Sequence, residues 1–112
     1  MIRRFEIYQL DNVEENRKRF FVRSEHQRTL GLDPAEGVYK KMWEDRIVCI
    51  ENKDIKDILE SIYSKFNLDR PKGFMGHSPS ISDIIKLDGV CWYIEPYGFS
   101  RIEMRGDGEN EV

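Results

Sequence analysis

The most regular pattern of apolar and polar positions lies near the middle of the chain. Between residues 54 and 66 the apolar side chains recur at helical spacing and would form one stripe: Ile55, Ile58, Leu59, Ile62, Tyr63 and Phe66. Asp54 and Asp57 fall in the first turn, where acidic side chains favour a helix, and Asn67 follows as a C-terminal stop. The pattern predicts one long amphipathic helix.

Short runs of β-forming residues on both sides of this helix predict strands. The expected strands cover 5–10, 19–23, 38–43, 47–50, 81–87, 90–95 and 99–104. Asp88-Gly89 is a strong hairpin signal, so we expect the last three strands to form an antiparallel meander. Ser24 predicts the cap of a short helix over 25–30.

These elements predict an α+β fold. It would hold a small antiparallel sheet of about five strands, with the long helix packed on one face and one short helix. The chain has 112 residues, which fits one domain. We expect the domain to span 1–105 and to be followed by a flexible acidic tail at 106–112.

The connection over 67–80 is longer than usual, and long loops in compact domains are often functional. It carries Phe74 and Met75 between glycines, followed by His77. Aromatic side chains and Met are enriched in the cores of interfaces, so these residues and Tyr97 are candidates for a partner site. The alternative for Phe74 is that its ring anchors the loop from beneath.

Composition narrows the class of protein. Apolar residues make up 39% and charged residues 35%, with a net charge of −3, which suits a small core but gives no general basic excess for nucleic acid. No apolar run approaches a membrane span, and the start of the chain lacks the apolar region of a signal peptide. Cys49 and Cys91 lie in apolar stretches and read as buried thiols, which favours a cytoplasmic location.

Signatures of catalysis or cofactor binding are missing. The sequence holds no phosphate-binding glycine loop, no dinucleotide fingerprint and no zinc-protease motif. His26 and His77 are the two histidines, too few with the distant cysteines for a clear zinc site. Asp83, with Ser78, Ser80 and Ser82 before it, is read as a structural carboxylate that accepts loop N–H bonds. We therefore predict that the protein is not an enzyme and that it binds no metal ion or cofactor.

Residues 17–23 are a candidate for direct nucleic-acid binding, because Arg and Lys surround Phe20 and Phe21 there. A stacking platform needs exposed rings beside a positive groove. A strand at 19–23 would instead bury both rings in the core, so the pattern favours a structural role.

Two C-terminal stretches are distinctive: Phe74-Met75-Gly76-His77-Ser78-Pro79-Ser80-Ile81-Ser82-Asp83 with Ile84-Ile85-Lys86-Leu87, and Cys91-Trp92-Tyr93-Ile94-Glu95-Pro96-Tyr97-Gly98-Phe99. Together they resemble the YodL-like domain family over roughly residues 5–102, with Pro79 and Glu95-Pro96 departing from the usual pattern. The resemblance implies a small accessory protein or module of a mobile genetic element. It supplies no catalytic residues.

The leading hypothesis is therefore a non-enzymatic inhibitor of a host defence nuclease, of anti-restriction or anti-CRISPR type. Carboxylates could then occupy the nuclease's nucleic-acid groove. The candidates are Glu14, Glu15, Asp54, Asp57, Glu60, Glu109 and Glu111. The alternatives are a regulatory adaptor for a host cytoplasmic protein, such as a cytoskeletal component, and an RNA-binding or RNA-processing protein.

Overall fold

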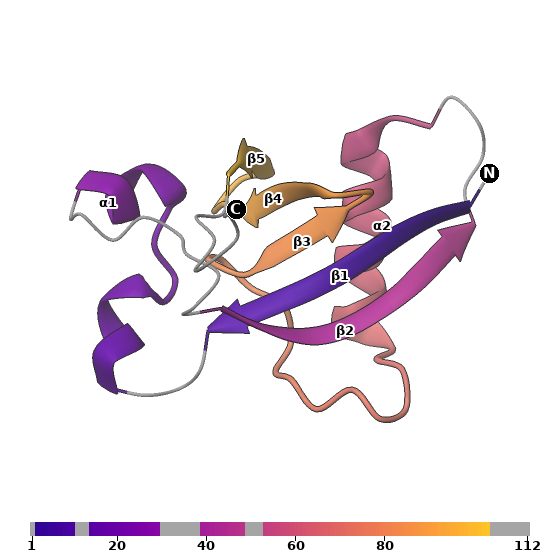
Figure 1. Cartoon of the computed structure of the whole chain (residues 1–112), viewed down its shortest axis with the longest axis horizontal. Helices are drawn as coiled ribbons and strands as arrows, with labels where there is room; N and C mark the ends of the chain where they lie inside the picture. The colour runs from indigo at the N-terminus through magenta and orange to yellow at the C-terminus, as the bar shows by residue number, and fades with distance from the viewer. Residues whose placement is uncertain (1, 11–13, 30–38, 49–52, 104–112) are drawn as a thin grey trace, which may run out of the picture.

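The computed structural model describes residues 2–10, 14–29, 39–48 and 53–103 (Figure 1). Its helical elements are the 3-10 helix η1 (Glu14–Arg19), α1 (Ser24–Thr29) and α2 (Ile55–Leu68). Its strands are β1 (Ile2–Leu10), β2 (Tyr39–Val48), β3 (Ile84–Leu87), β4 (Val90–Ile94) and β5 (Phe99–Ile102). The α+β class predicted from the sequence is confirmed.

All five strands form one antiparallel sheet in the order β2-β1-β3-β4-β5. The predicted meander of β3, β4 and β5 is present, and β3 pairs with β1 on its other side, from Phe5 opposite Leu87 to Tyr8 opposite Ile84. Asp88 and Gly89 both have positive φ, as the tight turn between β3 and β4 requires. The first strand thus lies inside the sheet.

One core joins α2 to the sheet. The buried α2 residues Ile58, Leu59, Ile62 and Phe66 share a cluster with Phe5, Ile7, Ile85, Leu87 and Ile94. The Phe66 ring meets the Phe5 ring edge-on at 6.0 Å. The apolar stripe read from the sequence is therefore the buried side of α2, and the long helix predicted over 54–66 is present.

A second core uses the alternate positions of the same strands. Its buried residues are Tyr8, Leu10, Tyr39, Ile84, Cys91, Tyr93 and Ile102, and Phe20 packs against them. Because successive side chains of a strand point to opposite faces, the two clusters lie on opposite sides of the sheet. Cys91 is buried as expected, whereas Cys49 lies outside the described residues.

Tyrosine hydroxyls and one glutamine fasten α1 to this second core. The amide of Gln27, fully buried, donates to the Tyr93 hydroxyl at 2.6 Å, and that hydroxyl donates to the backbone oxygen of Val22 at 2.7 Å. The Tyr39 hydroxyl donates to the oxygen of Ser82 at 2.7 Å. Burial raises the pKa of both tyrosines, so their hydroxyls keep the protons that these bonds need.

Several predicted boundaries were wrong. Residues 19–23 form no strand: Arg19 ends η1, and Phe21 lies in a turn with φ of 61°. The strands expected at 38–43 and 47–50 are one strand, β2, as far as the described residues reach, because it pairs with β1 from Tyr39 to Val48. The three residues between the two predicted strands, Glu44, Asp45 and Arg46, are charged and exposed, so the pattern of apolar positions is interrupted there although the strand continues.

Other boundaries moved by a few residues. α2 continues through Asn67 to Leu68, and β3 begins at Ile84 rather than 81 because Ser82 has a φ of 84°. No helix in the described ranges is long and apolar enough to cross a membrane. The predicted tail at 106–112 lies outside the described residues.

Candidate functional site

A hollow lies beside the turn after η1. We call it the Phe21 hollow. It has a volume of about 710 Å³ and is lined by Arg17, Phe20, Phe21, His77, Ser78 and Ser80. Its walls come from two segments far apart in the sequence, 17–21 and 77–80. Tertiary folding therefore creates it.

Phe21 is the most unusual residue of this hollow. It has a positive φ of 61° and leaves 65% of its surface exposed, with its ring 5.8 Å from that of Phe20. For a residue with a Cβ this backbone conformation costs about 1–2 kcal/mol. The backbone N–H of Phe21 donates to the Ser82 hydroxyl at 3.1 Å, and Ser82 itself is buried with positive φ. The fold thus stabilises an exposed phenyl ring in a strained turn.

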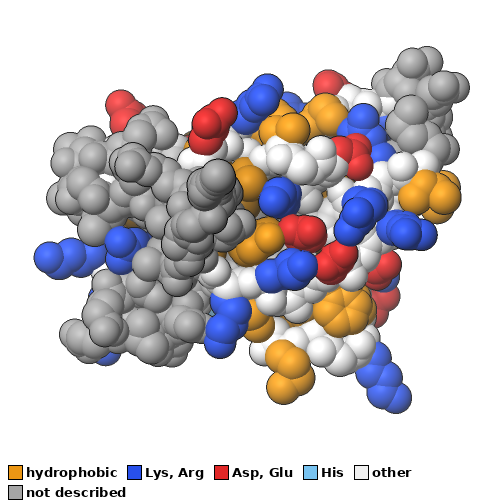
Figure 2. Space-filling view, viewed as in Figure 1, with side chains coloured by type: hydrophobic (Ala, Val, Ile, Leu, Met, Phe, Trp, Pro, Cys, Tyr) orange, Lys and Arg blue, Asp and Glu red, His pale blue; other side chains and the backbone are white. Residues whose placement is uncertain are grey.

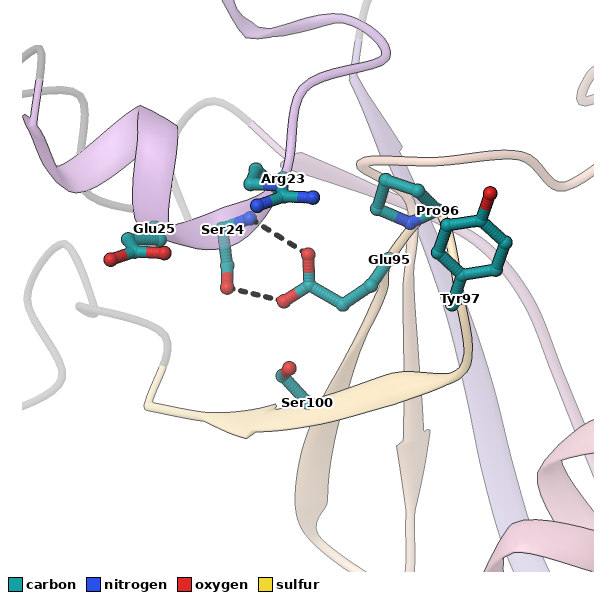
Figure 3. Close-up of a pocket in the computed structure, with 7 residues that line it drawn as sticks. All are labelled: Arg23, Ser24, Glu25, Glu95, Pro96, Tyr97 and Ser100. Atoms are coloured by element: carbon teal, nitrogen blue, oxygen red, sulfur yellow. Dashed lines mark hydrogen bonds between the residues drawn. The ribbon is translucent and has the colours of Figure 1, made fainter.

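The segment after Phe21 is held by two further side chains. Tyr93 fixes the oxygen of Val22, as described above, and the Glu95 carboxylate accepts hydrogen bonds from the backbone N–H and hydroxyl of Ser24 (Figure 3). Residues 21, 22 and 24 are therefore each bonded to the C-terminal part of the chain. Such pre-organisation reduces the conformational entropy lost when a partner binds.

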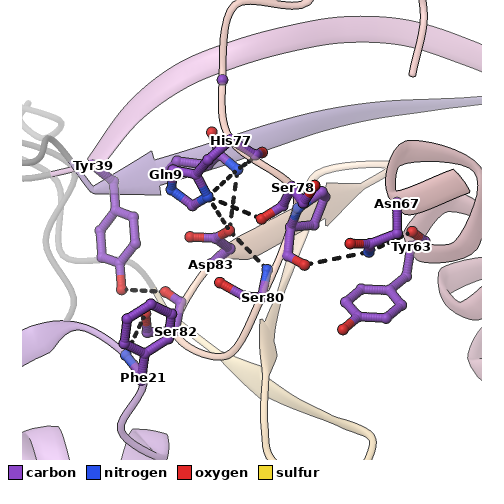
Figure 4. A network of polar contacts seen from close by, with 12 residues as sticks. Gln9, Phe21, Tyr39, Tyr63, Asn67, His77, Ser78, Ser80, Ser82 and Asp83 are labelled. Atoms are coloured by element: carbon purple, nitrogen blue, oxygen red, sulfur yellow. Dashed lines mark hydrogen bonds and ion pairs between the residues drawn. The ribbon is translucent and has the colours of Figure 1, made fainter. Parts of the chain in front are cut away.

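The other wall of the hollow rests on a buried polar group that we call the Asp83 cluster: Gln9, His77, Ser80 and Asp83 (Figure 4). Asp83 is fully buried, and its Oδ2 accepts from the Gln9 amide at 3.1 Å and from the Ser80 N–H at 3.0 Å. Nδ1 of His77 lies 3.8 Å from the same oxygen. The predicted role of Asp83 as a structural carboxylate in this loop is confirmed.

Burial dominates the electrostatics of Asp83. Loss of water raises the pKa of its carboxyl to about 6, against the opposing effects of the His77 charge and of the N–H bonds from Ser80 and Gln9. The second carboxylate oxygen, Oδ1, has no hydrogen-bond partner among the described residues. Since a buried charge without full hydrogen bonding is costly, the neutral form is favoured more than in an exposed aspartate.

Gln9 connects this cluster to the loop between α2 and β3. Its amide also donates to the backbone oxygen of His77 at 2.8 Å. Gly76 packs so closely that a Cβ there would lie 2.1 Å from Oε1 of Gln9. One buried side chain of β1 therefore sets the position of residues 76–77, and with them one wall of the Phe21 hollow.

The loop residues predicted to contact a partner have different environments. Phe74 is partly buried, with its ring 5.1 Å from that of Phe66 and 6.0 Å from that of Trp43. This arrangement matches the alternative in which Phe74 anchors the loop. Met75 is 85% exposed, and His77 lines the Phe21 hollow. The loop thus contributes one anchor and two accessible side chains.

Tyr97 lies at a different hollow, of about 400 Å³, between α1 and the turn before β5 (Figure 3). Its ring is 92% exposed. The lining is mainly polar and includes Arg23, Glu25 and Glu95. Glu95 is already occupied by the backbone and hydroxyl of Ser24, so this hollow offers fewer open groups than the first.

The acidic candidates Asp54, Asp57 and Glu60 are exposed at the beginning of α2. Lys53 and Lys56 alternate with them and are also exposed. Charges of both signs also lie side by side on β1 and β2, where Arg4 and Lys41 are each 2.8 Å from Glu44. Figure 2 shows Lys and Arg side chains interspersed with Asp and Glu on the face that it presents. Neither surface is a continuous field of negative charge.

Sequence reasoning missed Phe21 and Gln9 as site residues. The run Phe20-Phe21-Val22 has the composition of a buried strand, and no local signal marks a phenylalanine with positive φ. Gln9 is the residue before the last of its strand and looks like an ordinary solvent-facing position. Within the described ranges, no group of three or more His, Cys, Asp or Glu is placed to hold a metal.

Comparisons with known proteins give one match. The family model described as YodL-like domain matches residues 4–104, which is most of the chain. Searches of the curated proteins and of the solved structures returned no significant match. The matched range includes both walls of the Phe21 hollow and all strand pairings except those of Ile2 and Arg3 with β2. The chain therefore belongs to the YodL-like domain family.

Proposed function

We propose that this protein is a non-catalytic binding module that docks another protein at the Phe21 hollow. One observation carries the proposal: a phenylalanine that is 65% exposed is held in a left-handed turn by a hydrogen bond to a buried serine. Backbone strain of this kind persists only when the surrounding structure enforces it, and it concentrates at functional sites. The strain has no evident benefit for the core.

The hollow also has the composition of a binding hot spot. Aromatic rings and arginine dominate the energetics of protein interfaces, and the best anchors lie beside a recess that a partner side chain can fill. Phe20 and Phe21 supply the rings and Arg17 a cation. We infer that α2 covers one face of the sheet, because its buried residues share a core with β1, β3 and β4. The rim of the opposite face is then available to a partner.

A host defence nuclease in the cytoplasm remains our predicted partner, by analogy with the mobile-element setting of the family. Inhibition of the nuclease by mimicry of nucleic acid has less support, because Lys53 and Lys56 lie among the carboxylates at the beginning of α2. We therefore expect an inhibitor to act through the hollow. The adaptor hypothesis uses the same surface with a different host protein.

Direct nucleic-acid binding is the second candidate, and the structure gives a specific reason for it. The strand expected at 19–23 would have buried the rings of Phe20 and Phe21 and so left no stacking platform for bases. Phe21 is instead exposed and lines a hollow with Arg17. The net charge of −3 still weighs against general affinity for nucleic acid.

Site-specific photocrosslinking tests the proposal in host cells. The crosslinker p-benzoylphenylalanine would replace Phe21 in one variant and Leu68 in a matched control, because Leu68 is 86% exposed at the end of α2. We expect a discrete protein adduct at position 21 that is absent at position 68. RNA in place of a protein adduct would support the second candidate. Equal labelling at both positions, or none, would reject a docking role for the hollow.

An activity assay with restriction and RNA-guided nucleases separates the partner hypotheses. Inhibition by the wild type that is lost in Phe21→Gly would support the defence-nuclease prediction. A protein adduct at position 21 without inhibition of any nuclease would favour the adaptor.

A further inference from the structure

We propose that the Phe21 hollow recognises an acidic peptide segment that carries one aromatic or large apolar side chain. This inference rests on the proposed function and specifies the partner's chemistry. In the bound state the partner's apolar side chain would pack against Phe20 and Phe21. Its carboxylates would meet the cations and hydroxyls along the rim.

Local charge is the first argument. One wall of the hollow is basic although the whole chain is acidic, because Arg17 lines it and Lys18 and Arg19 follow in the sequence. Residues 17–23 contain four Lys or Arg, residues 70–82 contain two, and neither stretch contains Asp or Glu. The net charge of the chain is −3. Opposite charge on a partner speeds encounter and suppresses wrong partners.

The nearest carboxylate on the loop side adds little opposing charge to this surface. Asp83 is fully buried, and its contacts point to Gln9 and Ser80 within the protein. Asp69, at the other end of the loop, lies 3.9 Å from Lys65. Among the described residues that line the hollow, Arg17 carries a positive charge and none is Asp or Glu.

Hydrogen-bonding capacity is the second argument. The backbone groups of this wall are engaged, since the Ser80 N–H is held by Asp83 and the Ser78 oxygen lies 2.9 Å from Nδ1 of His77. The hydroxyls of Ser78 and Ser80 form no hydrogen bond to any described residue. Two hydroxyl donors beside a guanidinium suit a carboxylate.

The apolar part of the hollow is the third argument. The rings of Phe20 and Phe21 lie 5.8 Å apart and are tilted by 41°. Phe20 is supported from beneath by the second core, whereas Phe21 is exposed. A volume of about 710 Å³ accommodates one or two side chains rather than a folded domain. The geometry favours a short segment.

Selection from a displayed library of random 12-residue peptides tests this inference. The folded wild-type chain would be the target, with Phe21→Gly as the counter-target. We expect enriched peptides to share an aromatic or large apolar residue flanked by Asp or Glu. Enriched peptides without acidic residues, or none that depend on Phe21, would overturn the inference.

Fluorescence anisotropy with the best labelled peptide then measures the separate contributions. Replacing its acidic residues with their amides, or its aromatic residue with Ala, should each weaken binding by about tenfold or more. Lys18 follows Arg17 of the lining directly in the sequence. Lys18→Glu should weaken binding several-fold, whereas the matched reversal Lys56→Glu on α2 should change it less than twofold. Equal effects of both reversals would contradict a local charge contact.

A 20-nucleotide single-stranded RNA serves as competitor. RNA that displaces the peptide at similar concentrations would overturn the choice of a peptide and favour the second candidate function. A protein adduct at position 21 in cells, combined with peptides that lack acidic residues, would reject only this inference and leave the proposed function intact.

Discussion

At the scale of single residues, the turn at Phe21 holds an exposed side chain in a strained backbone conformation. Phe21 and Ser82 both adopt positive φ, and the hydrogen bond between them links the N-terminal turn to the residue two positions before β3. Either residue alone would relax toward ordinary backbone at a gain of about 1–2 kcal/mol. Their mutual support makes the exposed ring a fixed feature of the surface.

Replacing Phe21 with glycine should separate binding from stability. Glycine adopts positive φ without strain and keeps the backbone N–H that donates to Ser82. The relief offsets the lost ring contact and the extra entropy of the unfolded chain, so the free energy of unfolding should change by less than about 1 kcal/mol. Urea denaturation would measure it, together with loss of the adduct or peptide signal.

The control for this prediction is Phe20→Ala. Phe20 packs on the second core, so this variant should lose about 2 kcal/mol of stability. A Phe21→Gly variant that is destabilised as much as Phe20→Ala would show that the exposed ring stabilises the fold, which contradicts its assignment to binding.

Gly76 offers a second test at this scale. A methyl group there would lie 2.1 Å from Oε1 of Gln9, which is 2% exposed and cannot easily move away. Gly76→Ala should therefore cost about 1–3 kcal/mol in unfolding free energy. In a Gln9→Ala background the same substitution should cost less, although part of the cost should remain because the added methyl group would still lie 2.9 Å from Cζ of Phe74. Additive losses in the double variant would contradict direct crowding by Gln9.

At the scale of elements, α2 and the β3–β5 meander were predictable because their signals are local. The apolar stripe places Ile58, Leu59, Ile62 and Phe66 on one side of a helix in any context that buries it. Asp88-Gly89 needs no distant partner to favour a turn. The error at 19–23 arose because a short apolar run flanked by Arg reads as a strand, while a distant hydroxyl, that of Ser82, decides its conformation.

Phe66 tests how α2 holds the sheet and loop together. It is 1% exposed, and its ring contacts those of Phe5, Trp43 and Phe74 edge-on at 5.1–6.3 Å. Phe66→Ala should lower the free energy of unfolding by about 3–5 kcal/mol, as measured by urea denaturation. Leu68→Ala, two residues later on the exposed end, should cost less than about 0.5 kcal/mol. Similar losses for both would contradict the helix–sheet core.

At the scale of the whole molecule, the fold is a sheet with a core on each side. α2 contributes to one core, while α1 is fastened to the other by the polar contacts of Gln27 and Tyr93 (Figure 1). The second core is therefore partly polar and depends on satisfied hydrogen bonds. Asp83 extends this polar layer to the rim of the Phe21 hollow, so protonation there affects the stability of the entire fold.

The pH dependence of stability should carry the signature of Asp83. Burial raises the pKa of its carboxyl from 3.8 to about 6, so between these values the folded state binds a proton that the unfolded state has released. Its contribution to stability is full below about pH 4 and is lost as pH rises to about 6, by up to about 3 kcal/mol. Urea denaturation at several pH values would measure this loss.

Asp83→Asn isolates this effect from the other carboxylates. Its amide oxygen can still accept from Gln9 and the Ser80 N–H, yet the side chain does not titrate. The stability of the wild type relative to Asp83→Asn should therefore fall from pH 4 to pH 7. A constant difference across that range would show that the carboxyl of Asp83 is not perturbed by burial.

The α+β class, the long helix, the C-terminal meander and the membership of the YodL-like domain family could all be predicted from the amino-acid sequence, because each depends on local periodicity, turn chemistry or a contiguous motif. The sequence also marked the loop between α2 and β3, of which Met75 and His77 are accessible and Phe74 is an anchor. The exposure of Phe21 and the burial of Asp83 away from solvent follow from the tertiary fold instead. Both outcomes depend on contacts between residues some 60–75 positions apart, Phe21 with Ser82 and Asp83 with Gln9, and such contacts leave no pattern in the neighbouring sequence.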